Sequence, residues 1–361
     1  MNVRRWQIAK MCLFLMILCI VMGAISAVVV PKYLVENTDW PSTSTFKQFY
    51  EMDEDSIDVL FIGSSSMATD IMPQEIYDEY GITSYNLGTT EQNLIVSYYW
   101  LKEALRFQKP KVVVVDNQMM FTFYADEELN FKEPGQRKDF DYMKWSKVKV
   151  EAVHDICRID KSQSELSYYL PFIRYHDRWK ELVKRDFKYE TTKLYGYAPL
   201  IGETPLEDNA KSEPYTPLSD DIRIEDAAQI IDETDVDSKR HELMISYMDK
   251  IISLCKEQGI SVLILSSVSP TETETRHVIT KQFAAGHDIE FLDFNVKQLY
   301  EQAGLDYVTD NYDRRHMNVE GAKKISSFMG GYLMEHYGVT PREHHAFEET
   351  KGYFEEFLSR Q

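Results

Sequence analysis

Cysteine is scarce in this chain, with only four residues among 361. Cys12 and Cys19 lie in an apolar N-terminal run, whereas Cys157 and Cys255 are isolated from each other in the sequence. Two isolated cysteines can form at most one disulfide in an oxidising compartment, so they do not make a disulfide framework. The chain contains no Cys-x-x-Cys pair, which argues against a structural zinc site.

Several sequence motifs of cofactor enzymes are also missing. The chain has neither a Gly-x-x-x-x-Gly-Lys-Ser/Thr loop nor a Gly-x-Gly-x-x-Gly fingerprint, and we expect no cofactor. A Gly-x-Ser-x-Gly elbow is absent as well, which disfavours the α/β-hydrolase fold. His344 and His345 follow Glu343, but this spacing matches no recognised metal motif. We therefore interpret these histidines as a solvated patch and expect no metal.

Basic residues are outnumbered, because 40 Lys and Arg stand against 59 Asp and Glu, for a net charge of −19. The first 30 residues hold three basic and no acidic residues, so the remainder is still more acidic. Such a surface repels phosphate backbones and anionic lipid, and we expect no nucleic-acid partner. A neutral or cationic partner fits better, and solubility of an exported domain explains the charge equally well.

One long run without charge occurs at the N-terminus, over residues 11–30. As a helix it would be about 30 Å long, which matches the hydrocarbon core of a bilayer. Three basic residues precede it and favour a cytoplasmic N-terminus. A cleaved signal peptide is the alternative, because residues 24–27 resemble a cleavage site. The run continues through Val30, which favours a single-pass anchor in the cell membrane with an extracytoplasmic domain.

Short apolar runs alternate with segments of helical periodicity, which predicts βαβ units and a parallel sheet. We expect a three-layer α/β/α domain, flavodoxin-like in type, over residues 57–340 with about five mostly parallel strands. Residues 31–56 are expected to be a linker, and residues 341–361 a peripheral tail. The expected strands cover residues 57–62, 83–87, 111–116, 260–265 and 289–292. The expected helices cover residues 73–80, 94–105, 242–258 and 319–336, with another that ends at 286.

The pattern breaks between residues 121 and 235, where aromatic and charged residues dominate. Helical pieces are expected around 145–185, followed by a loop with Pro and Gly over 196–217. We interpret the segment as an insertion packed over the carboxyl edge of the sheet. It is either a lid or acceptor groove, or a structural cover, because aromatic side chains contribute much buried area in any core.

Chemically suggestive residues follow the expected strands. Ser65 follows the first strand, Gly88 the second and Asn117 the third, and ligands of open α/β sheets gather at these carboxyl ends. Asp313 and His316 precede the last long helix. A serine hydroxyl needs a base, which His316 can supply, and Asp313 can fix the tautomer of that ring.

The tetrahedral intermediate of acyl transfer needs hydrogen-bond donors for its oxyanion. The amides of Ser65 and Gly88 and the side chain of Asn117 are the candidates, although Asp116 or Gln118 can point inward instead of Asn117. Each of these residues also has a purely structural explanation. A Gly-Ser-Ser-Ser run often only begins a helix, Asp313 can cap a turn, and His316 can be a surface residue.

The order of these blocks resembles the SGNH (GDSL-like) hydrolase family. Gly63-Ser64-Ser65 stands where the family has Gly-Asp-Ser, and residues 86–88 are similar to its glycine block. Asp313-x-x-His316 matches its last block in full, whereas residues 115–117 keep only part of its Gly-x-Asn-Asp block. The resemblance covers roughly residues 57–120 and 240–337 and does not include the insertion.

The narrower resemblance is to membrane-anchored members of that family, such as the D-alanine-transfer protein of teichoic acid operons and the acetyltransferases of exported polysaccharides. It implies an acyl donor and a hydroxyl-bearing envelope polymer as substrates, often beside a multi-span membrane O-acyltransferase. The first hypothesis is therefore a membrane-anchored serine esterase or O-acyltransferase with Ser65, His316 and Asp313 as its catalytic residues. The second is a non-catalytic polymer-binding or assembly protein on the same scaffold.

Overall fold

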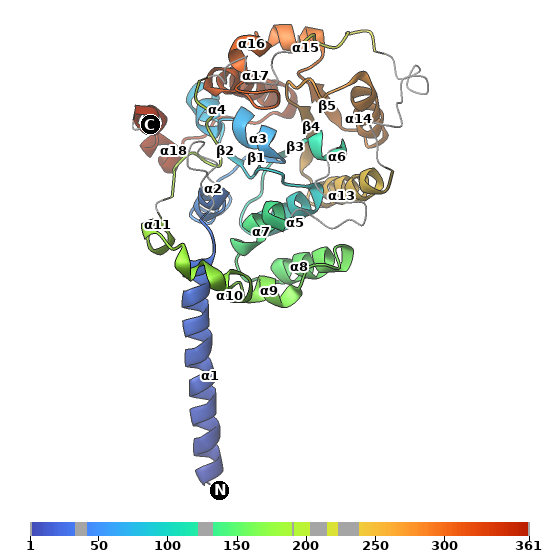
Figure 1. Ribbon diagram of the computed structural model, residues 1–361. Helices are drawn as coiled ribbons and strands as arrows, with labels where there is room; N and C mark the ends of the chain where they lie inside the picture. Colours follow the sequence, from blue (N-terminus) through green and yellow to red (C-terminus); the bar gives the residue numbers. More distant parts are fainter. Residues whose placement is uncertain are drawn as a thin grey trace.

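A five-stranded parallel sheet forms the centre of the protein (Figure 1). The computed structural model describes residues 2–32, 42–121, 133–189, 191–202, 215–222 and 238–359. The strand order is β2-β1-β3-β4-β5, which is the order of flavodoxin-like doubly wound folds. The predicted α/β fold class is therefore confirmed. The strands are β1 (Val59–Ile62), β2 (Ser84–Asn86), β3 (Val112–Asp116), β4 (Ser261–Ser266) and β5 (Glu290–Asp293).

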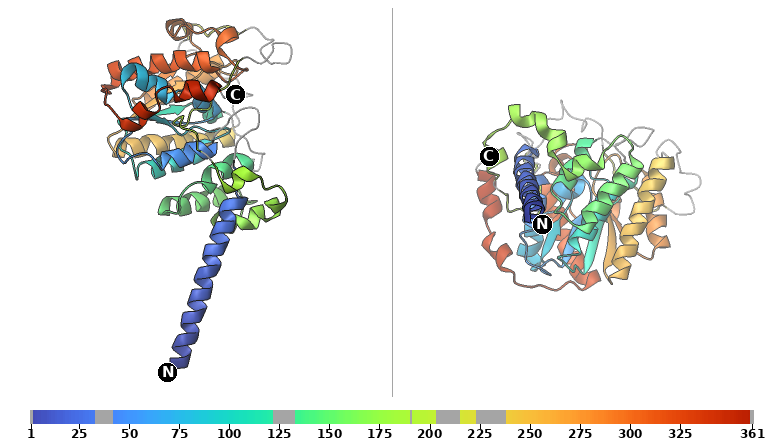
Figure 2. Two further views of the ribbon diagram at one scale, coloured as in Figure 1. Left: turned by 90° about the vertical axis from the view of Figure 1, so that its left-hand side faces the viewer. Right: turned by 90° about the horizontal axis from the view of Figure 1, so that it is seen from below.

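Helices cover both faces of this sheet, because its inner strands β1, β3 and β4 are apolar on both sides. Leu60 and Ile62 of β1 pack into one core with α2 (Ser42–Phe49), α5 (Leu94–Ala104) and α13 (Ser238–Glu257). Val59 and Phe61 point the other way, into a second core with α3 (Ser65–Asp70), α4 (Pro73–Tyr80) and α17 (Val319–Tyr337). The left view of Figure 2 shows helices on either side of the sheet.

The remaining elements lie around this three-layer centre. α2 brings Phe46 and Phe49 into the core, so part of the segment expected to be a linker is well packed. Cys157 and Cys255 are free thiols and are not bonded to each other. The other helices are α6 (Gln118–Phe121), α7 (Glu133–Asp141), α8 (Lys147–Ile159), α9 (Glu165–Tyr169), α10 (Phe172–Tyr175), η1 (His176–Lys180), α11 (Lys184–Phe187), α14 (Glu274–Gly286), α15 (Lys297–Gln302), α16 (Tyr307–Asp310), α18 (His345–Glu349) and α19 (Tyr353–Ser359).

Much of the described insertion lies away from the carboxyl edge of the sheet, where the sequence analysis placed it. α8 packs against α5 and α9, and α10 packs against α1, so these helices form an extra layer outside α5 (Figures 1 and 2). Two described stretches of the insertion run close to the carboxyl edge: residues 215–218, where the Tyr215 hydroxyl donates to Asn295 beyond β5 at 3.0 Å, and residues 194–200. There the Asn86 amide donates to the Tyr195 carbonyl, and the Ala198 amide donates to the Ala68 carbonyl.

The chain passes β2 very closely at Gly196. Its φ is +87°, and a Cβ at this position would lie 1.7 Å from the carbonyl oxygen of Asn86. We expect Gly196→Ala to lower the free energy of unfolding by more than about 3 kcal/mol, because strain and a backbone clash add. Gly202→Ala is the matched control: its φ is +79° with nothing within 4 Å, so only about 1 kcal/mol is expected. Equal losses in denaturant titrations of the two variants would contradict this close approach.

α1 (Asn2–Val29) projects from the body as a single rod (Figure 1). Among the described residues, Arg5–Val29 is the one helical stretch long and apolar enough to cross a membrane, by length and composition. A signal sequence would satisfy the same criterion.

Candidate active site

Ser65 lies at the carboxyl edge of the sheet, as the sequence predicts. β1 ends at Ile62, Ser64 is the N-cap of α3, and Ser65 is the first residue of that helix. The Ser65 Oγ lies 2.9 Å from Nε2 of His316, a residue 251 positions later in the chain. A neutral imidazole can accept the serine proton at this distance, as a general base does.

Asp313 holds the other side of the His316 ring. Nδ1 lies 2.8 Å from Oδ2 and 3.0 Å from Oδ1 of Asp313, which favours the tautomer that carries its proton on Nδ1. Burial of the Asp313 carboxyl disfavours its charged form, but hydrogen bonds from the His316 ring and from the amides of Arg315 and His316 outweigh burial. The pKa of Asp313 therefore lies below its usual value, and the carboxylate stays ionised at neutral pH.

The structure thus brings together the three residues that the sequence nominated for catalysis. A hairpin-like turn presents His316, since Asn311 and Met317 form an antiparallel bridge and the Tyr312 amide donates to the His316 carbonyl at 2.8 Å. Both side chains of the pair are only partly exposed, at 16% for His316 and 35% for Asp313. A substrate carbonyl can therefore reach the serine while the pair keeps its geometry.

Asp70 is a buried residue that the sequence analysis missed. Its Oδ1 accepts the Met317 amide at 2.9 Å and the Thr69 hydroxyl at 2.6 Å, so the last residue of α3 ties the His316 turn to the serine's own helix. Burial raises the pKa of Asp70 to about 6, against the opposing effect of these hydrogen bonds. The only signal in the sequence is an acid inside a short, otherwise uncharged helix.

Ser64 is bound to the end of the neighbouring strand β3. Oδ2 of Asp116 accepts both the amide and the hydroxyl of Ser64 at 2.5 Å. Gly63 makes room for this contact, because a Cβ there would lie 2.5 Å from the same oxygen. Asp116 therefore fixes the turn that leads into Ser65.

The Asp116 carboxyl is fully buried, and burial raises its pKa to about 6 despite the bonds from Ser64. A carboxyl whose pKa is higher in the folded than in the unfolded state favours folding below its unfolded pKa, and this contribution is lost as the pH rises to 6. Through Asp116, the wild type is expected to lose up to about 3 kcal/mol of unfolding free energy between pH 4 and pH 7. We expect Asp116→Asn to lack this loss. The measurement compares unfolding free energies at the two pH values within each protein, so any constant cost of the amide cancels. Identical pH dependence in wild type and variant would contradict this assignment.

Gln118, which the sequence left as an alternative, faces the serine run. Its Oε1 lies 2.6 Å from the Ser64 Oγ and 3.0 Å from the Ser66 Oγ. The Ser66 hydroxyl also reaches the Arg315 carbonyl at 3.2 Å, beside the His316 turn. Gln118 is thus the residue after β3 that joins the serine side of the site.

Asn117 points elsewhere. Its side-chain amide donates to Glu272 at 2.8 Å and to Thr280 at 3.3 Å, in a buried polar cluster on the side of β4. Burial, followed by the charge of Asp293, raises the pKa of Glu272 well above its usual value. Both amide hydrogens of Asn117 are therefore engaged, and its oxyanion role stays a prediction that requires a rearrangement.

Gly88 lies next to the serine helix, but its amide is also engaged. The Gly88 N–H donates to Asn86 Oδ1 at 2.9 Å, and the Asn86 side chain donates in turn to the Met67 carbonyl at 2.6 Å. A Cβ at Gly88 would lie 2.9 Å from the Cβ of Met67. The glycine is therefore needed for close packing against α3, and its part in an oxyanion hole remains a prediction.

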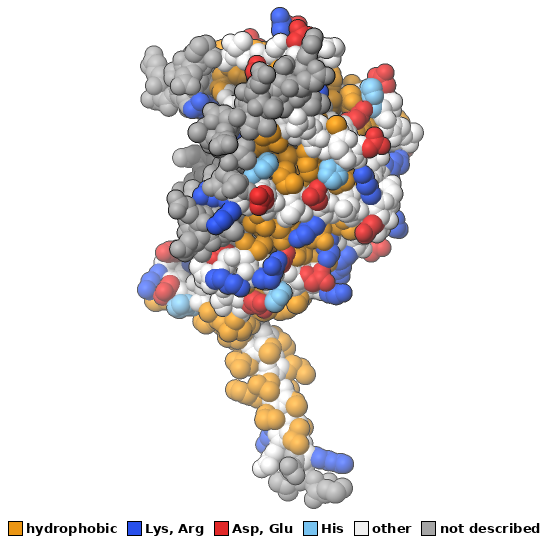
Figure 3. Space-filling view, turned by 90° about the vertical axis from the view of Figure 1, so that its right-hand side faces the viewer, with side chains coloured by type: hydrophobic (Ala, Val, Ile, Leu, Met, Phe, Trp, Pro, Cys, Tyr) orange, Lys and Arg blue, Asp and Glu red, His pale blue; other side chains and the backbone are white. Residues whose placement is uncertain are grey.

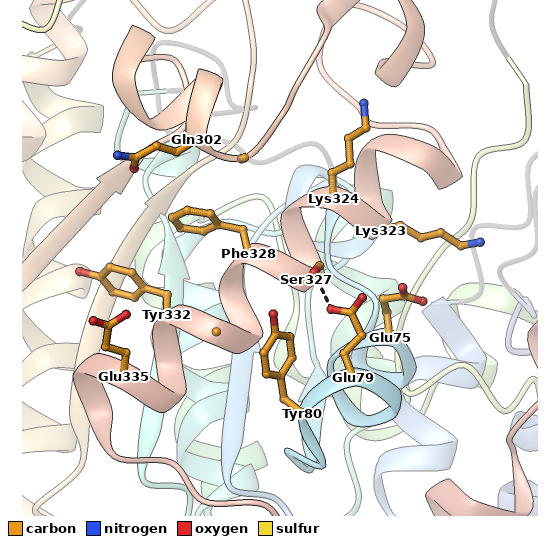
Figure 4. A pocket seen from close by; sticks show the side chains of 12 residues that line it. Glu75, Glu79, Tyr80, Gln302, Lys323, Lys324, Ser327, Phe328, Tyr332 and Glu335 are labelled. Atoms are coloured by element: carbon orange, nitrogen blue, oxygen red, sulfur yellow. Dashed lines mark hydrogen bonds between the residues drawn. The ribbon is translucent and has the colours of Figure 1, made fainter.

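Two other features of the described chain lie apart from these residues. A hollow of about 560 Å³ opens between α4 and α17, where Ser327 donates to Glu79 near Tyr80 (Figure 4). Its lining includes none of the residues nominated for catalysis. The ligand atoms of Asp53, His344 and His345 lie within 4.8 Å of one another. Asp53 precedes β1, so this group lies toward the amino ends of the strands, opposite Ser65.

Comparison with known proteins yields distant likenesses. No family model and no curated protein matches the chain. Among solved structures, a proposed acylhydrolase from Bacteroides fragilis is 9% identical, with 81% of this chain and 94% of that chain covered and a TM-score of 0.36. A GDSL-like lipase from Bacteroides thetaiotaomicron is also 9% identical, with 81% and 97% covered and the same TM-score of 0.36.

A gut microbial diltiazem-metabolizing enzyme is 14% identical, with 80% of this chain but only 48% of that chain covered and a TM-score of 0.28. Likenesses this distant carry no argument about activity. The case for a function therefore depends on the geometry around Ser65.

Proposed function

We propose that the protein is a membrane-anchored serine esterase or O-acyltransferase of the SGNH type, with Ser65 as its nucleophile. The observation that carries this proposal is the continuous chain of contacts from the Ser65 hydroxyl through the His316 ring to the Asp313 carboxylate. A nucleophile, a base and an orienting acid in this order define serine acyl-transfer sites on unrelated folds.

The first half of the reaction makes an acyl-enzyme. The Ser65 Oγ attacks the carbonyl carbon of an acyl ester while its proton passes to Nε2 of His316. Asp313 stabilises the resulting imidazolium, because the pKa of this carboxyl is low and it stays charged. Collapse of the tetrahedral intermediate releases the alcohol, which takes the proton from Nε2 and leaves the acyl group on Ser65.

The second half transfers that acyl group. His316 accepts a proton from an incoming hydroxyl, whose oxygen attacks the acyl-serine, and the proton then returns to the Ser65 oxygen as the new ester leaves. Water as the acceptor makes the protein an esterase, whereas a sugar or polyol makes it a transferase. The Ser65 amide, at the first residue of α3, is one donor for the oxyanion.

An envelope polymer is the acceptor that we propose, with the chain anchored outside the cytoplasm through α1. The length and composition of α1 and the SGNH-type spacing of the blocks support this assignment. A multi-span membrane O-acyltransferase that delivers the acyl group is the partner implied by the same resemblance. Mass analysis of envelope polymers from cells with wild-type protein and with Ser65→Ala tests the proposal. Acyl esters that depend on Ser65 support it, and identical polymers contradict it.

A second function is favoured by one observation. The Gly88 amide and the Asn117 side chain are both engaged elsewhere, which weakens oxyanion stabilisation. A polymer-binding protein on the same scaffold would tolerate this arrangement. The two functions differ in turnover: an enzyme releases nitrophenol from nitrophenyl acetate, and a transferase also acylates added glycerol, whereas a binding protein does neither.

A further inference from the structure

The insertion packs against the C-terminal end of α1. The Arg178 guanidinium donates to the Val29 carbonyl at 2.6 Å, and the Phe172 amide donates to the Ser26 hydroxyl at 3.3 Å. Val29 and Val30 are buried against Tyr175. The rod and the body therefore meet through α10 and η1.

The helices that contact α1 are themselves held to the body through α7. The Tyr175 hydroxyl donates to Asp141 of α7 at 2.6 Å, and the guanidinium of Arg137, also on α7, stacks 4.0 Å from the ring of Tyr168. The side chains of Arg137 and Asp141 are both buried, and a buried charge destabilises the fold unless it is paired. The position of α1 thus sets the height of the body above any membrane that α1 crosses.

The free length of α1 is short for a bilayer. The body begins to cover the helix at Ser26, and residues 11–25 rise only about 22 Å, against about 30 Å for a hydrocarbon core. If Lys10 marks the cytoplasmic boundary, the underside of the body is immersed by several ångströms. If Arg5 marks it, residues 6–25 rise about 30 Å and the underside lies at the surface. The body contacts the bilayer in both cases.

The underside is built of exposed apolar side chains. Trp179 is 66% exposed and Phe187 68%. Figure 3 shows apolar side chains continuing from α1 onto the lower face of the body. An open apolar cavity of about 680 Å³ lies between α1 and this face, lined by Ile25, Val28, Phe172, Trp179, Leu182 and Phe187, among others. Apolar patches of this kind mark interaction surfaces.

The segment that forms this lower face, from α9 to α11, carries a net positive charge, opposite to that of the whole chain. Residues 165–188 hold six basic and four acidic residues, in a protein whose net charge is −19. Aromatic and basic side chains together are typical of segments that lie at a membrane interface, where anionic headgroups attract Lys and Arg. The general expectation that this acidic protein avoids anionic lipid therefore does not hold for this segment.

We propose that α9, α10, η1 and α11, with their connections over residues 165–188, form a docking collar that enters the outer leaflet around α1. Its occupant is phospholipid: acyl chains fill the apolar cavity, and the basic residues meet the headgroups. The collar holds the body, and with it Ser65, at a fixed height and tilt over the membrane. This inference rests on the anchoring proposed above and not on the chemistry at Ser65.

Site-directed spin labelling of the full chain in nanodiscs of phosphatidylcholine and phosphatidylglycerol tests the collar. The background carries Cys12→Ala, Cys19→Ala and Cys157→Ser, while buried Cys255 is kept. Nitroxides are placed at Trp179→Cys and Phe187→Cys in the collar. Leu15→Cys reports the membrane segment, and Val308→Cys, 52% exposed on α16 at the opposite end of the body, reports water (Figure 1).

Collisions with oxygen and with a water-soluble nickel chelate locate each label. We expect the oxygen-to-nickel ratio at positions 179 and 187 to exceed that at 308 by about fivefold or more, and to approach that at 15. Collar labels that behave like 308 while label 15 is in lipid overturn the collar but leave the anchor intact. Collar labels shielded from both reagents indicate a protein occupant and also overturn it. Water exposure at position 15 refutes the anchoring itself. Fluorophosphonate labelling of Ser65 tests the catalytic proposal independently of all these outcomes.

Discussion

Replacing Ser65 by alanine is expected to lower ester turnover by about 10⁴-fold or more. The variant keeps His316 and Asp313 but has no oxygen to carry the acyl group, so only substrate binding and general base catalysis of water remain. Turnover of nitrophenyl acetate by purified full-length protein in detergent measures the loss. Among the described residues, the Ser65 hydroxyl forms its side-chain hydrogen bond with the His316 ring, so we expect the fold and the unfolding midpoint to stay close to wild type.

Ser66→Ala is the matched control for this experiment. Ser66 is the next hydroxyl in the run, and it bonds to Gln118 and to the Arg315 carbonyl rather than to the His316 ring. We expect its turnover to remain within about tenfold of wild type, because it supports the site without touching the reacting atoms. A large loss in Ser66→Ala with normal turnover in Ser65→Ala would contradict the assignment of the nucleophile.

Replacing His316 by alanine is expected to cost about as much as replacing Ser65, because the serine then has no base. Asp313→Asn is expected to cost about 10²- to 10⁴-fold, since an amide in place of the carboxylate favours the wrong tautomer of His316. The double variant Ser65→Ala, His316→Ala should be no slower than either single variant, because residues that act as one unit are not additive.

His345→Ala is the control for a lost imidazole, because this ring is 67% exposed and lies near Asp53 rather than Ser65. We expect wild-type turnover from it. Multiplicative losses in the double variant would show that Ser65 and His316 act independently, and that result would not fit a shared proton transfer.

The fold could be read from the sequence because β1, β3 and β4, the three inner strands of the sheet, contain short apolar runs between turn residues. Residues 112–115 of β3 are apolar on both faces, as a covered parallel strand requires. Helix ends followed from local chemistry as well: α4 ends at Gly81 with φ +66°, as the glycine predicts. The helix expected over residues 94–105 begins as α5 at Leu94, where the Asn93 side chain accepts the amides of Ile95 and Val96.

The site was only partly predictable. Ser65, Asp313 and His316 followed from motif order, but residues beyond β3 depend on which way each side chain points. Consecutive side chains alternate across a strand end, so Asp116 and Gln118 reach the serine run while Asn117 turns toward Glu272. Spacing cannot distinguish these directions. Asp70 was missed because its only partners of note are backbone and hydroxyl groups brought together by the fold.

The position of the insertion could not be predicted from composition. Aromatic side chains serve both in cores and at membrane surfaces, and only the structure separates buried Tyr168 from exposed Trp179. The contact of α10 with α1 joins segments more than a hundred residues apart, and no local pattern encodes it.

Covalent labelling tests the central claim most directly. Full-length protein is treated with a fluorophosphonate, its intact mass is recorded, and the modified peptide is sequenced. A single adduct on Ser65, absent from both Ser65→Ala and His316→Ala, is the predicted result, because only a serine paired with a base reacts in this way. Folded wild-type protein that gains no mass, or that carries the adduct on Ser64 or Ser66, would contradict it.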